Sequence, residues 1–156
     1  MLLTHVNPYT GNSYANEPAV GFVEVNNENS ILSRWTAFAD LKGDHRVALA
    51  AMWRDFLAKN GKSNWDIYKV IDQFDAGATD EQKEMFWEFL VETELSYAEE
   101  MVEFLKNDIG VKMPVSESQA SYSGMAGVYR EAKYADFIDM HAYWQHPRWL
   151  GRAWDR

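Results

Sequence analysis

The chain has 156 residues, enough for one domain of ordinary size with its own hydrophobic core. Hydrophobic residues make up 47% and charged residues 25%, a composition typical of soluble globular proteins and unlike that of disordered or collagen-like chains. The formal net charge of -9 would repel phosphate backbones, so nucleic acid is excluded as a partner.

Targeting and redox signals are sparse. No apolar run reaches the roughly 18 residues that a membrane-spanning helix needs, so no membrane partner is expected. The first residues lack the basic flank and long apolar stretch of a signal peptide. Cysteine is absent, which excludes disulfides and thiolate metal sites but fits a reducing or an oxidising compartment equally. The localisation is therefore unknown, and a longer parent protein could be secreted or periplasmic.

Secondary-structure elements are expected to alternate along the chain. A short apolar run over 19–25, introduced by Pro18, predicts a buried strand. Helical periodicity predicts a helix over 44–58 with Asp44 as its N-cap, and a shorter helix over 63–74.

The second half of the chain continues this alternation. Apolar residues at three-four spacing predict a long helix over 79–108, beginning with a capping box and stopped by Gly110. A strand over 111–116, a helix over 124–133 and a third strand over 136–141 follow.

This order predicts an α/β fold built from parallel βαβ units. A complete (β/α)8, or TIM, barrel needs about 250 residues, so three strands can form only part of one. The expected architecture is a partial (β/α)8 barrel over residues 1–156, in which 31–78 form a helical insertion after the first strand present.

Polar residues end two of the expected strands, at 26–30 (NNENS) and at 139–144 (DMHAYW). Together with flanking residues, the first motif resembles the fourth-strand region of clan A glycoside hydrolases, in particular the cellulase-like and mannanase-like enzymes of family 5. The second motif resembles the sixth-strand region of the same clan. The flanking residues that contribute are 7–11 (NPYTG), Tyr14, 17–20 (EPAV) and 24–25 (EV). The resemblance implies a retaining hydrolase of O-glycosidic bonds in a β-linked glycan, without a cofactor.

The resemblance also implies residue roles at the first motif. Glu28 matches the general acid/base, which protonates the departing glycosidic oxygen and later deprotonates water, and which needs a raised pKa to begin protonated. Asn27 matches the residue that hydrogen-bonds the sugar 2-hydroxyl, a contact expected to strengthen in the transition state.

At the second motif, His141 and Tyr143 match residues that flank the cleavage subsite, and Trp144 would line the cleft. Aromatic rings suit a carbohydrate substrate because the apolar face of a pyranose stacks on them. His146 and Trp149 are expected to line the same cleft.

The nucleophile of the resembled family is a Glu at the end of strand seven. Residues 144–156 resemble a loop, with Asp155 as their one acidic residue, and the segment from Leu2 resembles the end of a third helix. The sequence therefore predicts an internal fragment that covers about strands four to six. The rest of the barrel would belong to a longer parent chain, and the isolated chain would be inactive.

Several residues have simpler interpretations. Without the flanking matches, Glu28 would be a turn or N-cap carboxylate and His141 a structural histidine. Glu117 lies just beyond the second strand and either binds sugar or is solvated. The four histidines lack the H-x3-H helical pair of zinc sites, so no metal site is expected. Many glutamates of 79–108 are expected to form its solvated face, among them Glu84, Glu88, Glu92, Glu99 and Glu103.

Two other functions remain open. One is a non-catalytic carbohydrate-binding protein or an inactive relic of the family, which would keep the aromatic cleft without the nucleophile. The other is a helical interaction module that uses the acidic insertion and the long helix.

Overall fold

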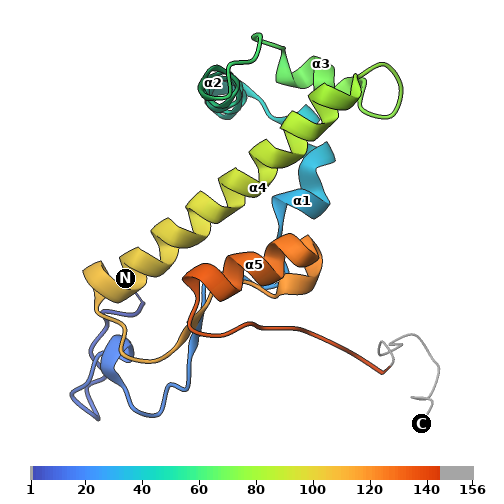
Figure 1. Ribbon diagram of the computed structural model, residues 1–156. Coiled ribbons are helices and arrows are strands. Elements are labelled where there is room, and N and C mark those ends of the chain that lie inside the picture. Colours follow the sequence, from blue (N-terminus) through green and yellow to red (C-terminus); the bar gives the residue numbers. More distant parts are fainter. Residues whose placement is uncertain (1, 145–156) are drawn as a thin grey trace, which may run out of the picture.

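The computed structural model describes residues 2–144. A long helix, α4 (Asp80–Glu103), connects a helical unit at one end of the molecule to a pair of short strands at the other (Figure 1). Helix α5 (Met125–Tyr134) packs beside α4.

The helical unit comprises α1 (Ile31–Arg34), η2 (Trp35–Asp40), α2 (Gly43–Lys59), α3 (Ile67–Asp72) and the first half of α4. The helix predicted over 44–58 is confirmed as α2, but its N-cap is Lys42 rather than Asp44. The second predicted helix is confirmed as α3, which is shorter than expected because Asp66 caps it by accepting a hydrogen bond from the Tyr68 N–H. The buried core of this unit consists of Leu49, Trp53, Phe56, Leu57, Ile67, Val70, Ile71, Met85, Phe86, Phe89 and Leu90.

Helix α4 begins where its capping box predicts. The Thr79 hydroxyl accepts from the Gln82 N–H, and the Gln82 side chain accepts from the Thr79 N–H. The last turns widen into a π-helical segment, η3 (Phe104–Ile109), which ends at Gly110 with a φ of 78°. Such a left-handed C-terminal residue favours glycine, so the predicted end of the helix is confirmed.

Two strands form the sheet. Strand β1 (Val23–Glu24) pairs in parallel with β2 (Val115–Ser116), and the order of the elements requires the helical unit and α4 to form the connection between them. Backbone hydrogen bonds from the N–H groups of Val25 and Asn26 extend the pairing beyond β1. Both strands are shorter than predicted.

The third predicted strand, over 136–141, is wrong as a strand, although the segment lies beside β2. The Asp136 N–H donates to the Val115 carbonyl at 2.8 Å, and the Ala120 N–H donates to the Asp139 carbonyl at 2.9 Å. Between these two bonds the Glu131 carboxylate accepts from the N–H groups of Ser118 and Asp139. A side-chain carboxylate thus replaces the backbone ladder that would make a strand.

The architecture is therefore mixed α/β, dominated by helices, with a two-stranded parallel sheet. Two strands within residues 2–144 do not make a barrel, so the predicted fold class holds at the level of mixed α/β only. No helix in this described part of the chain is both long and apolar enough to cross a membrane.

Candidate functional site

The site forms where β1 ends and the backbone turns toward α1. The strand-end loop, residues 26–30, contains Glu28, which has a φ of 49°. Among residues 2–144, Glu28 is the one residue other than glycine that has a positive φ. A left-handed backbone costs a non-glycine residue about 1–2 kcal/mol, so other contacts must hold Glu28 in this conformation.

Glu28 meets His141 at this edge of the sheet. The Glu28 Oε1 atom lies 2.9 Å from the His141 Nδ1 atom, and the Asp139 Oδ2 atom lies 3.1 Å from the His141 Nε2 atom. Hydrogen bonding to Glu28 raises the pKa of His141 above its ordinary value, with a further contribution from the charge of Asp139. The imidazole thus bridges two carboxylates and favours its doubly protonated form.

Glu24 completes the cluster from within β1. Burial raises the pKa of its carboxyl, and the negative charge of Asp139 raises it further, against the opposing effect of His141. The strand-end cluster, which we define as Glu24, Glu28, Asp139 and His141, therefore holds three carboxyls and one imidazole. A group with a raised pKa beside acceptors is suited to proton transfer.

The strand-end cluster is less suited to binding a metal ion than to proton transfer. Ligand atoms of Glu24, Asp139 and His141 lie within 4.8 Å of one another. Both ring nitrogens of His141 already face carboxylate oxygens, an arrangement that favours an imidazolium and not the neutral imidazole that a metal requires. We therefore assign no metal to these residues.

The other predicted site residues are less tightly held. Asn27 is exposed on the strand-end loop. Tyr143 is 62% exposed and Trp144 is fully exposed, so the structure does not enclose either ring in a cleft. His146 and Trp149 lie outside the described residues. Of the predicted constellation, the structure brings Glu28 and His141 into contact.

Glu117 corrects one expectation, because it is buried rather than solvated. The Glu117 Oε2 atom lies 2.7 Å from the Arg130 Nε atom. The Nη1 atom of the same arginine lies 2.6 Å from the Glu94 Oε2 atom. Burial raises the pKa of Glu117, while Arg130 and a hydrogen bond from Asn26 oppose that rise. We call Glu94, Arg130 and Glu117 the buried charge triad; all three are less than 10% exposed.

Some of these residues could have been found from the sequence. Asp139 precedes His141 by two positions, the spacing that puts side chains on one face of an extended segment. Glu94 falls between Leu90 and Ala98 at four-residue spacing, so it occupies a core position on α4. The predicted solvated face of that helix is confirmed for Glu84, Glu88, Glu92, Glu99 and Glu103.

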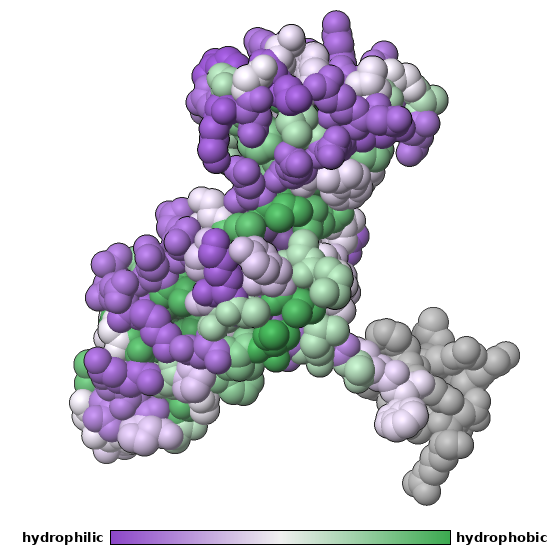
Figure 2. Space-filling view, viewed as in Figure 1, coloured by the Kyte–Doolittle hydropathy of each residue, from purple (hydrophilic) through white to green (hydrophobic). Residues whose placement is uncertain are grey.

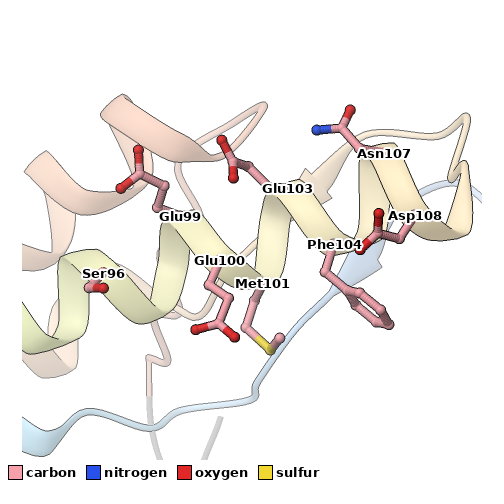
Figure 3. Close-up of a pocket in the computed structure, with 8 residues that line it drawn as sticks. All are labelled: Ser96, Glu99, Glu100, Met101, Glu103, Phe104, Asn107 and Asp108. Atoms are coloured by element: carbon pink, nitrogen blue, oxygen red, sulfur yellow. The ribbon is translucent and has the colours of Figure 1, made fainter.

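Several hollows lie along α4, and one of them adjoins the strand-end loop. A cavity of about 200 Å³ lies between the strand-end loop and the helix, where Asn26, Glu94, Tyr97 and Glu117 are among its lining residues. A larger, open hollow of about 600 Å³ follows the C-terminal half of α4, and its side chains project to different sides of the helix (Figure 3). It shares no residue with the strand-end cluster.

A scan against protein-family models and searches of curated proteins and of solved structures found no match to this chain. The functional argument therefore depends on the geometry of the site and on the sequence motifs.

Proposed function

We propose that the strand-end loop and residues 136–144 form the acid/base side of the active site of a retaining glycoside hydrolase. The substrate class is a β-linked glycan, and the reaction is hydrolysis of its O-glycosidic bonds. The observation that best supports this proposal is the 2.9 Å contact between Glu28 and His141, which joins two motifs that are 113 residues apart in sequence. The two motifs resemble the same family independently, and their acidic and imidazole groups meet.

The proposal includes a finer fold. In it, β1 and β2 are two successive strands of a (β/α)8 barrel, the segment 136–141 lies beside β2 in the place of the next strand, and α5 is the connection that leads to it. Parallel pairing of β1 and β2 supports this, as do the exposed apolar side chains of Phe22, Ile138 and Met140. Exposed apolar side chains beside a sheet are suited to packing against further parts of a barrel.

Hydrophobic area is also exposed elsewhere. Figure 2 shows hydrophobic residues across the middle of the molecule, over α5, whereas the helical unit is mostly hydrophilic. Met125 and Tyr129 of α5 are both more than half exposed. The proposed partner of these surfaces is the remainder of the barrel in a longer parent chain.

Glu28 would be the general acid/base and His141 its hydrogen-bond partner. Because the pKa of His141 is raised, its ring carries a proton beside the Glu28 carboxylate over a wider pH range than a free histidine would. In the protonated form, Glu28 would give its proton to the departing glycosidic oxygen and afterwards take one from water, and the charged His141 ring would stabilise the Glu28 carboxylate left between the two steps. The second carboxylate, the nucleophile, is assigned to the parent chain.

Substrate contacts would come from Asn27, Tyr143 and Trp144, with His141 flanking the same subsite. Asn27 is exposed beside Glu28 and offers an amide for a sugar hydroxyl. The exposed rings of Tyr143 and Trp144 are suited to stacking on a pyranose.

The proposal is tested by the leaving-group dependence of a Glu28→Gln variant, made in the protein expressed from its complete gene. Unactivated oligosaccharides need the proton from Glu28, so their kcat/KM should fall by about 10²–10⁴. Aryl glycosides with good leaving groups need it less and should lose much less in the glycosylation step. The exposed Glu99→Gln serves as the matched control and should leave both rates unchanged.

Equal losses on both substrate classes would reject Glu28 as the acid/base. The second candidate, a non-catalytic carbohydrate-binding protein, is favoured by the exposure of Tyr143 and Trp144. It predicts oligosaccharide binding that a Trp144→Ala variant weakens, with no hydrolysis by the unmodified protein.

A further inference from the structure

The strand-end loop is fastened at three points by side chains from α4 and from the segment that follows β2. The first is Ser118, which follows β2 and is fully buried. Its hydroxyl accepts a hydrogen bond from the Asn29 N–H at 3.2 Å and donates to the Asn29 carbonyl at 3.3 Å. One serine thus fixes both backbone groups of the residue next to Glu28.

The second anchor is Glu94, which reaches the end of the loop from α4. Its Oε1 atom accepts from the Ser30 hydroxyl at 2.5 Å and from the Ile31 N–H at 2.6 Å. The Leu32 N–H lies 3.4 Å from the same oxygen. A buried carboxylate therefore holds the chain where it leaves the loop and begins α1.

The third anchor acts at the start of the loop. The Asn26 amide donates to the Tyr97 hydroxyl at 3.1 Å and lies 3.5 Å from Glu117 Oε1. Arg130 of α5 links this anchor to the second one, because it pairs with both Glu117 and Glu94. The two ends of the loop are thus connected through one buried guanidinium.

These anchors matter because Glu28 has a strained backbone. Its positive φ is maintained only if the residues on both sides are held, since a free loop would relax to an ordinary conformation. We propose that Ser118 and Glu94 are positioning residues, which hold the strand-end loop so that the Glu28 carboxylate reaches His141. This inference rests on the proposed role of Glu28 and assigns its supporting residues.

The test is the pKa of the His141 imidazole, measured by NMR titration of its ring protons in the full chain. The groups that face this ring are Glu28, Asp139 and Glu24. A Glu28→Gln variant sets the scale, because it should lower the pKa of His141 toward the ordinary value of about 6.5. Ser118→Ala and Glu94→Gln leave all three facing groups in place, yet should produce most of the same fall.

Two controls separate positioning from general stability. Ser96→Ala removes an exposed hydroxyl from α4 and should leave the pKa unchanged. Leu57→Ala destabilises the helical unit, away from the loop, and should lower the melting temperature without moving the pKa of His141.

The outcomes are distinct. If Ser118→Ala lowers the pKa of His141 and Leu57→Ala does not, the positioning role is supported. If Glu28→Gln lowers it and Ser118→Ala leaves it at the wild-type value, the inference is overturned while the proposed function stands. Ser118→Ala decides alone if Glu94→Gln fails to fold. Because no substrate is involved, failure of the hydrolase proposal in its own assay leaves this result unaffected.

Discussion

Removal of the guanidinium from the buried charge triad should be among the most destabilising single changes in the described structure. The Arg130 side chain is 2% exposed and pairs at 2.6 Å with Glu94 and at 2.7 Å with Glu117. An Arg130→Met substitution keeps much of the side-chain volume but leaves two carboxylates buried without a counter-charge. Breaking a buried pair in this way costs about 3–5 kcal/mol.

The cost should be at the lower end of that range, about 3 kcal/mol, because one carboxyl can become neutral. Burial already raises the pKa of Glu117, so loss of Arg130 would raise it further and favour its protonated form. This remains a large part of the roughly 5–15 kcal/mol by which a folded domain is stable.

Urea unfolding followed by circular dichroism at neutral pH measures this free energy of unfolding. The matched control is Arg54→Met, because Arg54 makes an exposed pair with Asp55 and should change stability by at most about 1 kcal/mol. A triple variant, Arg130→Met with Glu94→Gln and Glu117→Gln, removes all three charges and should recover part of the loss. An Arg130→Met effect no larger than that of Arg54→Met would refute the buried triad.

Three further changes test other parts of the structure. Because folding raises the pKa of both Glu117 and His141, the folded state binds their protons more tightly than the unfolded chain does. Their stabilisation is complete below the ordinary values of 4.5 and 6.5 and is lost as the pH rises through the raised values. The urea midpoint should therefore fall as the pH rises from about 5 to about 8. In Glu117→Gln this fall should be smaller, and an unchanged dependence of the midpoint on pH would contradict the reasoning. Gly127→Ala should cost at least about 1–3 kcal/mol, since the added methyl would overlap the Ala120 carbonyl, and an unchanged melting temperature would contradict that packing. Trp53→Ala should cost about 3–5 kcal/mol in urea unfolding, because the ring is 1% exposed in the helical unit; a loss below about 1 kcal/mol would contradict its burial.

The helices could be predicted from the sequence because local signals fix them. The capping box at Thr79 and the left-handed glycine at 110 set the two ends of the longest helix without reference to the rest of the fold. The prediction that Asp44 is the N-cap of α2 was wrong, because an acidic residue is favourable in the first turn of a helix as well as at the N-cap itself.

The strands were harder to predict because their pairing depends on distant residues. The segment 136–141 has the pattern of a strand, but the Glu131 carboxylate takes the N–H groups of Ser118 and Asp139 that a ladder would use. No local pattern shows that a glutamate on α5 will do so.

The candidate site was predicted in part. The motifs identified Glu28 and His141, which do meet. Asp139 and Glu24 stand in or beside the same motifs, but no role was predicted for either, and the fold brings them to the His141 ring. The buried charge triad combines residues from α4, from the segment just after β2 and from α5, so only the tertiary fold brings it together.

The most direct test of the central claim is a crystal structure of the Glu28→Gln protein, expressed from its complete gene, with a β-linked oligosaccharide bound. We expect a glycosidic oxygen within hydrogen-bonding distance of the side chain at position 28, with the His141 ring on the other side of that side chain and the ring of Trp144 against a sugar. A sugar bound elsewhere, or Glu28 and His141 directed to opposite ends of the sheet, would contradict the assignment of this site to glycoside hydrolysis.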